Sequence, residues 1–155
     1  METYMTFNLT KDQIEIQQRA RQIASTLVAE NAVEVDKSEQ YPWDNVKALT
    51  DAGFVGMTIP KEYGGPGRSF LDANLVVEEM AAYCGPTGRI AVEANMGAIS
   101  AVMHYGTDFQ KRLAAELVLA GDKPAICITE PDAGSAASQM TTRADKRGDK
   151  YVING

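Results

Sequence analysis

Three segments of the sequence have the spacing of a helix-capping box, and each precedes apolar residues at helical spacing. In such a box, a Ser or Thr side chain accepts a hydrogen bond from the backbone N–H of the third residue after it. The side chain of that third residue in turn accepts a hydrogen bond from the backbone N–H of the Ser or Thr. The boxes begin at Thr10, Ser69 and Thr107. Because they satisfy donors that only the start of a helix leaves free, they restrict most of the chain to a helical fold.

Glycine and proline residues mark where these helices end. Together with the apolar spacing, they predict helices over residues 10–32, 42–53, 69–85, 88–105 and 107–121. Residues 54–60 are short and interrupted by glycine, so we expect an extended connector there.

The pattern changes near Pro124. Residues 125–129 form a short apolar run that suits a buried strand, which would bury Cys127. Residues 140–144 and 151–154 flank a polar turn, which predicts a β-hairpin. One hairpin and one strand are marginally stable in water, so we expect the beginning of a larger β-domain.

The expected fold is therefore mainly α, with a helical bundle domain over residues 1–123 and the start of an incomplete β-domain over 124–155. The length of 155 residues fits one domain plus the opening of another. A net charge of −6 argues against nucleic acid or an anionic membrane surface as the partner. We also expect no membrane insertion, since no apolar run approaches the roughly 18 residues of a span.

The cysteine and histidine residues of the sequence do not form a metal-binding or redox motif. Cys84 and Cys127 lack metal-ligand spacing, and His104 is the only histidine, so we expect no metal site and a reducing, cytoplasmic setting. The adjacent Glu78 and Glu79 point to different sides of a helix and are expected to be solvated.

Residues 126–135 carry the sharpest local signal. A predicted strand leads through a proline-fixed turn into Ala133, Gly134 and Ser135, where successive backbone N–H groups can face an anion. No lysine follows Gly134, which excludes the nucleotide P-loop. From these residues alone, a purely structural turn is the alternative.

Three segments resemble the acyl-CoA dehydrogenase superfamily, in the same order and at the same spacing. They are residues 60–65 (PKEYGG), 105–111 (YGTDFQK) and 128–135 (ITEPDAGS). The resemblance implies an N-terminal helical domain followed by a β-domain against which FAD lies, with an acyl-CoA thioester between the domains. It also implies a homodimer or homotetramer.

By position in this motif, backbone groups of Ile128 and Thr129 and the Thr129 hydroxyl are expected to face the flavin ring. Gly134 and Ser135 are expected near the pyrophosphate, with Ser135 also touching the pantetheine arm of the substrate. The cofactor-binding residues that the resemblance implies are Ile126, Cys127, Ile128, Thr129, Gly134 and Ser135. Ala136 departs from the family pattern, in which an aspartate is common.

The resemblance implies α,β-dehydrogenation of an acyl-CoA thioester by the whole protein. The catalytic base of the family, usually a glutamate in a C-terminal helical bundle, is expected beyond Gly155. We therefore expect no catalytic residue in this chain, and we expect the chain alone to be inactive and to hold flavin weakly.

Arg89 is expected at the far end of the acyl pocket, according to the same resemblance. A guanidinium there suits a bidentate anionic group on the acyl tail, such as a carboxylate or sulfinate. Glu93 lies one helical turn further on and is a second candidate in this pocket, where it can pair with Arg89. A solvated arginine near a helix start is the alternative.

Residues 39–46, 51–54 and 134–138 resemble a branch of the family that releases sulfite from 3-sulfinopropanoyl-CoA. In that branch FAD is bound but no net oxidation occurs. Desulfination is therefore the alternative chemistry. An alternative of another class is a non-catalytic helical interaction module, in which residues 126–135 would be only a turn.

Overall fold

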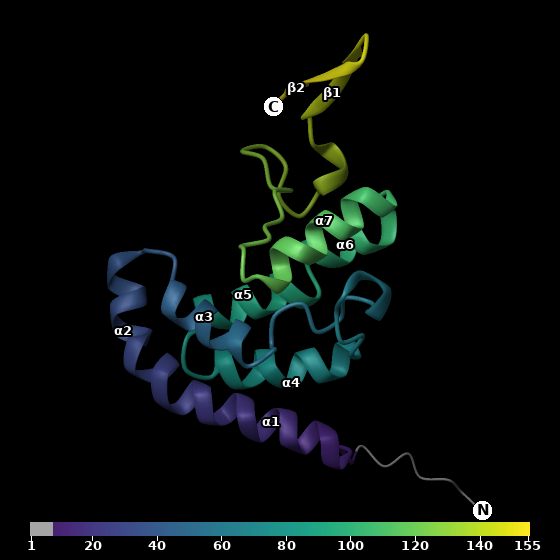
Figure 1. Ribbon diagram of the computed structural model, residues 1–155. Helices are drawn as coiled ribbons and strands as arrows, with labels where there is room; N and C mark the ends of the chain where they lie inside the picture. The colour runs from purple at the N-terminus through teal and green to yellow at the C-terminus, as the bar shows by residue number, and fades with distance from the viewer. Residues whose placement is uncertain (1–7) are drawn as a thin grey trace, which may run out of the picture. The chain divides into compact units, whose positions relative to one another are not determined.

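The computed structural model describes residues 8–155 and has a mainly helical architecture followed by a two-stranded antiparallel sheet (Figure 1). This confirms the predicted fold class. The chain forms two compact units, of which the first ends at Ala125 and the second comprises Ile126–Gly155.

The first helix is longer than its sequence pattern predicted. It comprises α1 (Lys11–Ile23), a π-helical segment η1 (Ala24–Val28) and α2 (Ala29–Ser38), and it ends where Glu39 adopts a left-handed conformation with φ of 54°. The expected end near residue 32 was wrong, because no helix-breaking residue precedes Glu39 and Asn31 bonds to the next helix.

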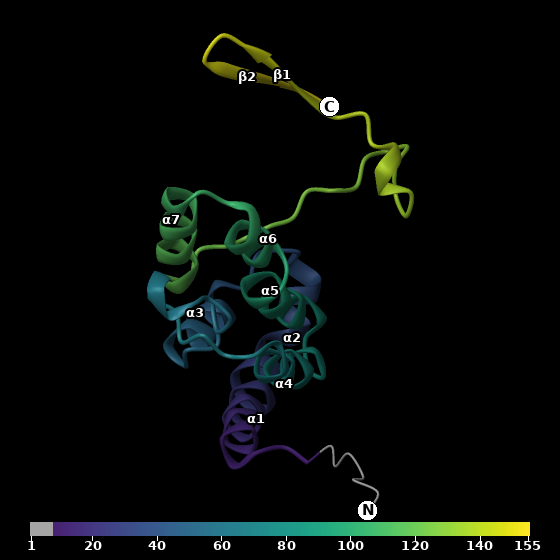
Figure 2. The same ribbon diagram turned by 90° about the vertical axis from the view of Figure 1, so that its right-hand side faces the viewer.

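Helix α4 (Phe70–Ala81) lies between α1 and α5 (Gly85–Asn95) (Figure 2). Its Ser69 capping box is formed, and its buried side is anchored to α1 by an ion pair. Both Glu79 carboxylate oxygens accept hydrogen bonds from Arg21, at 3.0 and 2.7 Å. The prediction that Glu79 is solvated was therefore wrong, because its partner lies on another helix and could not be read from local spacing.

The region predicted as one helix over 88–105 contains two helices, α5 (Gly85–Asn95) and α6 (Ala98–Tyr105). Pro86 lies in the first turn of α5, where its missing N–H costs nothing, so it begins a helix instead of preventing one. The break after α5 is held by the fully buried Asn95. Its side chain accepts from Met57 N and donates to Phe54 O.

Two further helices complete this unit, namely α3 (Trp43–Asp51) and α7 (Asp108–Leu119). The segment between α3 and α4 includes a short 3-10 helix, η2 (Lys61–Tyr63). The extended connector expected over 54–60 is wrong, because these residues follow turns and bends and supply side chains to the core. The largest fully buried side chains of the core are Phe54, Leu49, Ile59, Met80, Ile99, Val28 and Val76.

The second unit contains β1 (Arg143–Arg147) and β2 (Lys150–Asn154), paired from Arg143 opposite Asn154 to Arg147 opposite Lys150. The predicted hairpin is confirmed, with β1 beginning three residues later than expected. The predicted buried strand over 125–129 is wrong, because no described residue pairs with it and its side chains are exposed. Cys127 is accordingly exposed, contrary to the prediction.

Candidate functional site

Residues 126–129 form an extended segment with an open main chain. Within the described residues 8–155, none of their N–H or C=O groups takes part in a hydrogen bond. The four residues are also exposed. The segment therefore offers a row of backbone donors and acceptors without a partner among the described residues. A ligand that covers them can supply the hydrogen bonds that backbone groups need once they are buried.

A tight turn follows this segment and ends in an open corner. Glu130 and Ala133 exchange two main-chain hydrogen bonds, both of 3.1 Å. Beyond the turn, a Cβ added to Gly134 would meet no atom within 4 Å, and Ser135 is exposed. The corner is therefore accessible to a ligand along its main chain.

The carboxylate of Glu130 holds this turn against the residues that precede β1. It accepts hydrogen bonds from Thr141 N at 2.8 Å, from the Thr141 hydroxyl at 3.0 Å and from Thr142 N at 2.8 Å. These bonds, first of all the one from the Thr141 backbone, lower the pKa of Glu130 to about 2. Sequence reasoning missed this role, because the donors lie beyond the turn motif itself.

These residues fit the cofactor that the sequence resemblance implies. FAD needs main-chain donors at its ring heteroatoms and close backbone approach at its pyrophosphate. Ile128 and Thr129 offer the first through their unpaired backbone groups, and Gly134 and Ser135 offer the second. Ile126 and Cys127 belong to the same open segment, whereas Ala136 provides no carboxylate.

The helical unit contains the second candidate site. Arg89 lies on α5 with 68% of its side chain exposed, and it forms an ion pair with Glu93 one turn later. Glu93 is largely buried and also accepts a hydrogen bond of 3.1 Å from Ala98 N at the start of α6. The structure thus brings the two residues together, as their spacing predicted.

Arg89 borders a hollow of about 360 Å³ between α5 and the segment that joins α2 to α3. Its lining is mainly apolar apart from Arg89, Glu39 and Gln40. The lining residues are Val35, Glu39, Gln40, Tyr41, Pro42, Pro86, Arg89 and Ile90.

A buried chain of polar side chains fixes the first turn of α5, and sequence reasoning missed it. Asn31 donates to Asn45 at 2.8 Å, Asn45 donates to Thr87 at 2.9 Å, and the Thr87 hydroxyl donates to the sulfur of Cys84 at 3.2 Å. Asn45 and Thr87 are fully buried. The sequence signal that could have indicated this chain is Asn45, a polar residue beside the core residue Val46.

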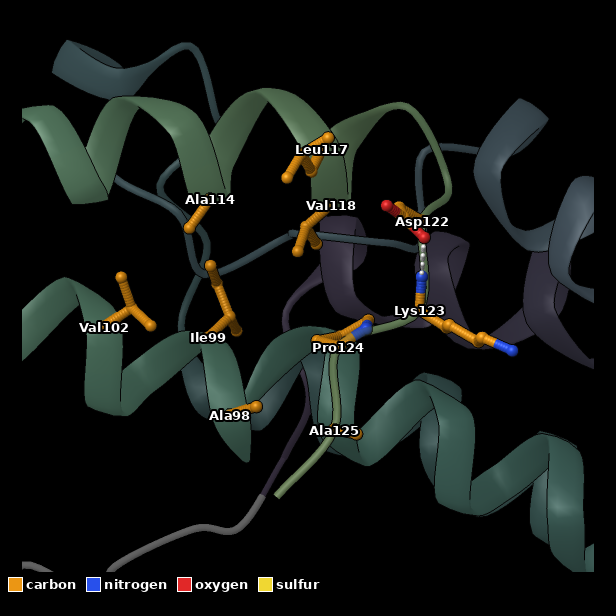
Figure 3. Close-up of a pocket in the computed structure, with 10 residues that line it drawn as sticks. All are labelled: Ala98, Ile99, Val102, Ala114, Leu117, Val118, Asp122, Lys123, Pro124 and Ala125. Atoms are coloured by element: carbon orange, nitrogen blue, oxygen red, sulfur yellow. Dashed lines mark hydrogen bonds between the residues drawn. The ribbon is translucent and has the colours of Figure 1, made fainter. Parts of the chain in front are cut away.

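A separate apolar pocket of about 230 Å³ lies between α6, α7 and residues 122–125 (Figure 3). Ile99, Val102 and Val118 form much of its wall, and the Lys123 side chain extends away from them. Asp122 and Lys123 are the charged residues of its lining. Among the described residues no group of His, Cys, Asp or Glu could hold a metal ion, and no helix could span a membrane.

A family profile described as the acyl-CoA dehydrogenase N-terminal domain matches residues 10–122. The chain belongs to this family. The 3-sulfinopropanoyl-CoA desulfinase of Variovorax paradoxus is 62% identical over 149 residues, and that of Cupriavidus necator is 59% identical. The short-chain specific acyl-CoA dehydrogenase of Clostridium acetobutylicum is 38% identical over 152 residues.

These matches cover nearly all of the chain but only part of each relative. The chain spans 37% and 38% of the two desulfinases while 96% of it is matched. Among solved structures, butyryl-CoA dehydrogenase from Megasphaera elsdenii has a TM-score of 0.85 at 29% identity, covering 97% of this chain and 41% of that one. Glutaryl-CoA dehydrogenase with glutaryl-CoA has a TM-score of 0.88 at 30% identity, covering 97% and 39%.

Proposed function

We propose that the whole protein is an FAD-binding enzyme that desulfinates 3-sulfinopropanoyl-CoA, releasing sulfite. One observation carries this choice over dehydrogenation: the desulfinases are 58–62% identical to the chain, whereas the short-chain dehydrogenase is 38% identical. In this proposal residues 1–123 form the helical domain and residues 124–155 open the β-domain.

Arg89 recognises the sulfinate of the acyl tail in this proposal. A sulfinate presents two oxygens, which match the paired donors of a guanidinium. Arg89 contacts Glu93 through Nη2, which leaves other N–H donors of the guanidinium for a ligand. Its exposure and its place beside the hollow of about 360 Å³ support this role.

The open segment provides the flavin cradle. We assign the ring contacts to the backbone of Ile126, Cys127, Ile128 and Thr129, and the pyrophosphate contacts to Gly134 and Ser135, with Ser135 also on the pantetheine arm. FAD, when bound, supplies an electron-accepting ring on which main-chain donors stabilise negative charge. We assign the catalytic base to a part of the whole protein outside these 155 residues, and we expect the chain alone to be inactive.

Sulfite release by the whole protein tests the reaction. With 3-sulfinopropanoyl-CoA as substrate, Arg89→Gln should lower kcat/KM by about 10- to 100-fold, the worth of lost hydrogen bonds to a charged group. Arg112→Gln is the matched control, because Arg112 is similarly exposed and pairs with Asp108 one turn away on α7. Equal activity of both variants with the parent would remove Arg89 from substrate recognition.

Dehydrogenation of an acyl-CoA thioester is the second candidate. The fold similarity to butyryl-CoA dehydrogenase favours it. Reduction of an artificial electron acceptor with butanoyl-CoA, without sulfite release from 3-sulfinopropanoyl-CoA, would establish it in place of desulfination. Family membership favours either reaction over a non-catalytic helical interaction module.

The family assignment supports a proposal for the assembly, and the two cysteines support one for the setting. We propose a homodimer or homotetramer, which the mass of the whole protein in solution tests. Cys84 and Cys127 are free thiols, in keeping with a cytoplasmic, reducing setting.

A further inference from the structure

The carboxylate of Glu93 is engaged at both oxygens. One oxygen pairs with Arg89 Nη2, and the other accepts a hydrogen bond of 3.1 Å from Ala98 N. Only 8% of the residue is exposed. A buried carboxylate held on both sides cannot change rotamer without leaving Ala98 N unpaired or its own charge uncompensated.

The break between α5 and α6 leaves room for this carboxylate. A Cβ built on Gly97 would overlap the Glu93 oxygen that faces Ala98. Glycine at this position permits the close approach of the Glu93 side chain.

Arg89 is more exposed than its partner, with 68% of its side chain accessible against 11% for Glu93. An exposed arginine samples many rotamers, and fixing them costs conformational entropy when a ligand binds. An anchored carboxylate reduces this cost, because it holds one edge of the guanidinium in place. The guanidinium contacts Glu93 through Nη2, so other N–H donors are left for a ligand.

We propose that Glu93 is a positioning residue, which fixes Arg89 so that its remaining donors select acyl-CoA thioesters with an anionic tail. This inference rests on the proposed function, in which Arg89 recognises that tail. Glu93 itself contacts the guanidinium and the start of α6, and not the substrate.

The charge of Glu93 opposes an incoming anion, but this repulsion is reduced in two ways. The start of α6 carries about half a positive elementary charge, which offsets part of the carboxylate charge. Solvent around the exposed Arg89 screens the rest. We therefore expect the gain from a fixed guanidinium to exceed the repulsion.

Binding to the whole protein loaded with FAD tests this inference without turnover. Calorimetry with no electron acceptor present gives dissociation constants for 3-carboxypropanoyl-CoA and for butanoyl-CoA, which match in length and differ in tail charge. Glu93→Gln should lower the preference for the anionic tail by about fivefold or more, since the unheld arginine regains its rotamer freedom. An unchanged or increased preference would overturn the positioning role.

Glu79→Gln is the matched control. Glu79 is also a buried glutamate paired with a mostly exposed arginine, but it joins α4 to α1 away from Arg89. The Glu79→Gln variant should leave the preference for the anionic tail unchanged. If it lost as much of this preference as Glu93→Gln does, the effect would be one of general destabilisation and the inference would be overturned.

Two further variants separate the possible failures. Gly97→Ala keeps every charge but displaces the Glu93 carboxylate, so it should also lower the preference, and an unchanged preference counts against the inference. Arg89→Gln tests the proposed function: if the preference persists there, Arg89 does not recognise the tail. If the preference is lost in Arg89→Gln but intact in Glu93→Gln, only the positioning role of Glu93 fails.

Discussion

At the scale of single residues, two buried glutamates are each paired with an exposed arginine, one along a single helix and one between two helices. The pairing of Arg89 with Glu93 follows from their spacing. The buried pair of Arg21 and Glu79 does not, because the two residues meet only when α1 packs against α4.

The titration of Glu130 is a prediction at this scale. Its pKa of about 2 lies below the ordinary value of 4.5, because Thr141 and Thr142 donate hydrogen bonds to the ionised carboxylate. The carboxylate therefore contributes stability above pH 4.5 that is lost as the pH falls through 2. Carboxyl NMR of the protein should give a midpoint near 2, and the amide signals of Thr141 and Thr142 should shift with it.

Glu130→Gln should remove that pH dependence from the two threonine amides. A midpoint near 4.5 in the parent would show instead that the three hydrogen bonds to the carboxylate are not formed.

At the scale of elements, the capping boxes fixed the starts of three helices correctly, because a cap is a local interaction. The break between α5 and α6 was missed, because it depends on Asn95 bonding to the segment between α3 and α4. The apolar run over 125–129 was misjudged for a related reason: a strand needs a partner strand, and its own residues do not supply one.

Asn95→Ala tests the importance of this break. The substitution leaves the buried Met57 N–H and Phe54 carbonyl without their partner, so the free energy of unfolding should fall by about 2–4 kcal/mol. Urea unfolding measures the loss. Asn74→Ala, at an exposed position of α4, should change stability by less than about 0.5 kcal/mol, and an equal effect of both changes would contradict the structure.

Gly88→Ala tests the contact between α4 and α5. A Cβ at this position would lie 2.6 Å from the Cβ of Ala81 and 2.8 Å from its Cα, so the helices must move apart. Such overpacking should destabilise the protein by about 1–3 kcal/mol in thermal or urea unfolding. Gly85→Ala is the control on the same helix, because a Cβ there meets no atom within 4 Å outside its chain neighbours, and we expect a smaller loss than for Gly88→Ala, limited to the contact with Pro86.

At the scale of the whole molecule, sequence reasoning recovered the fold class and the family, because three motifs at family spacing span most of the chain. It also selected the open segment of the second unit and the Arg89–Glu93 pair. The polar chain from Asn31 to Cys84 and the clamp at Glu130 were not recovered, because both connect residues from separate elements.

The central claim is that residues 126–135 receive FAD and that Arg89 recognises an anionic acyl tail. A crystal structure of the whole protein with FAD and 3-carboxypropanoyl-CoA tests it most directly. The account predicts hydrogen bonds from the Ile128 and Thr129 main chain to the flavin ring, and a tail carboxylate on Arg89 with Glu93 still bound to Ala98 N. A flavin bound away from residues 126–135, or a tail carboxylate that does not contact Arg89, would contradict it.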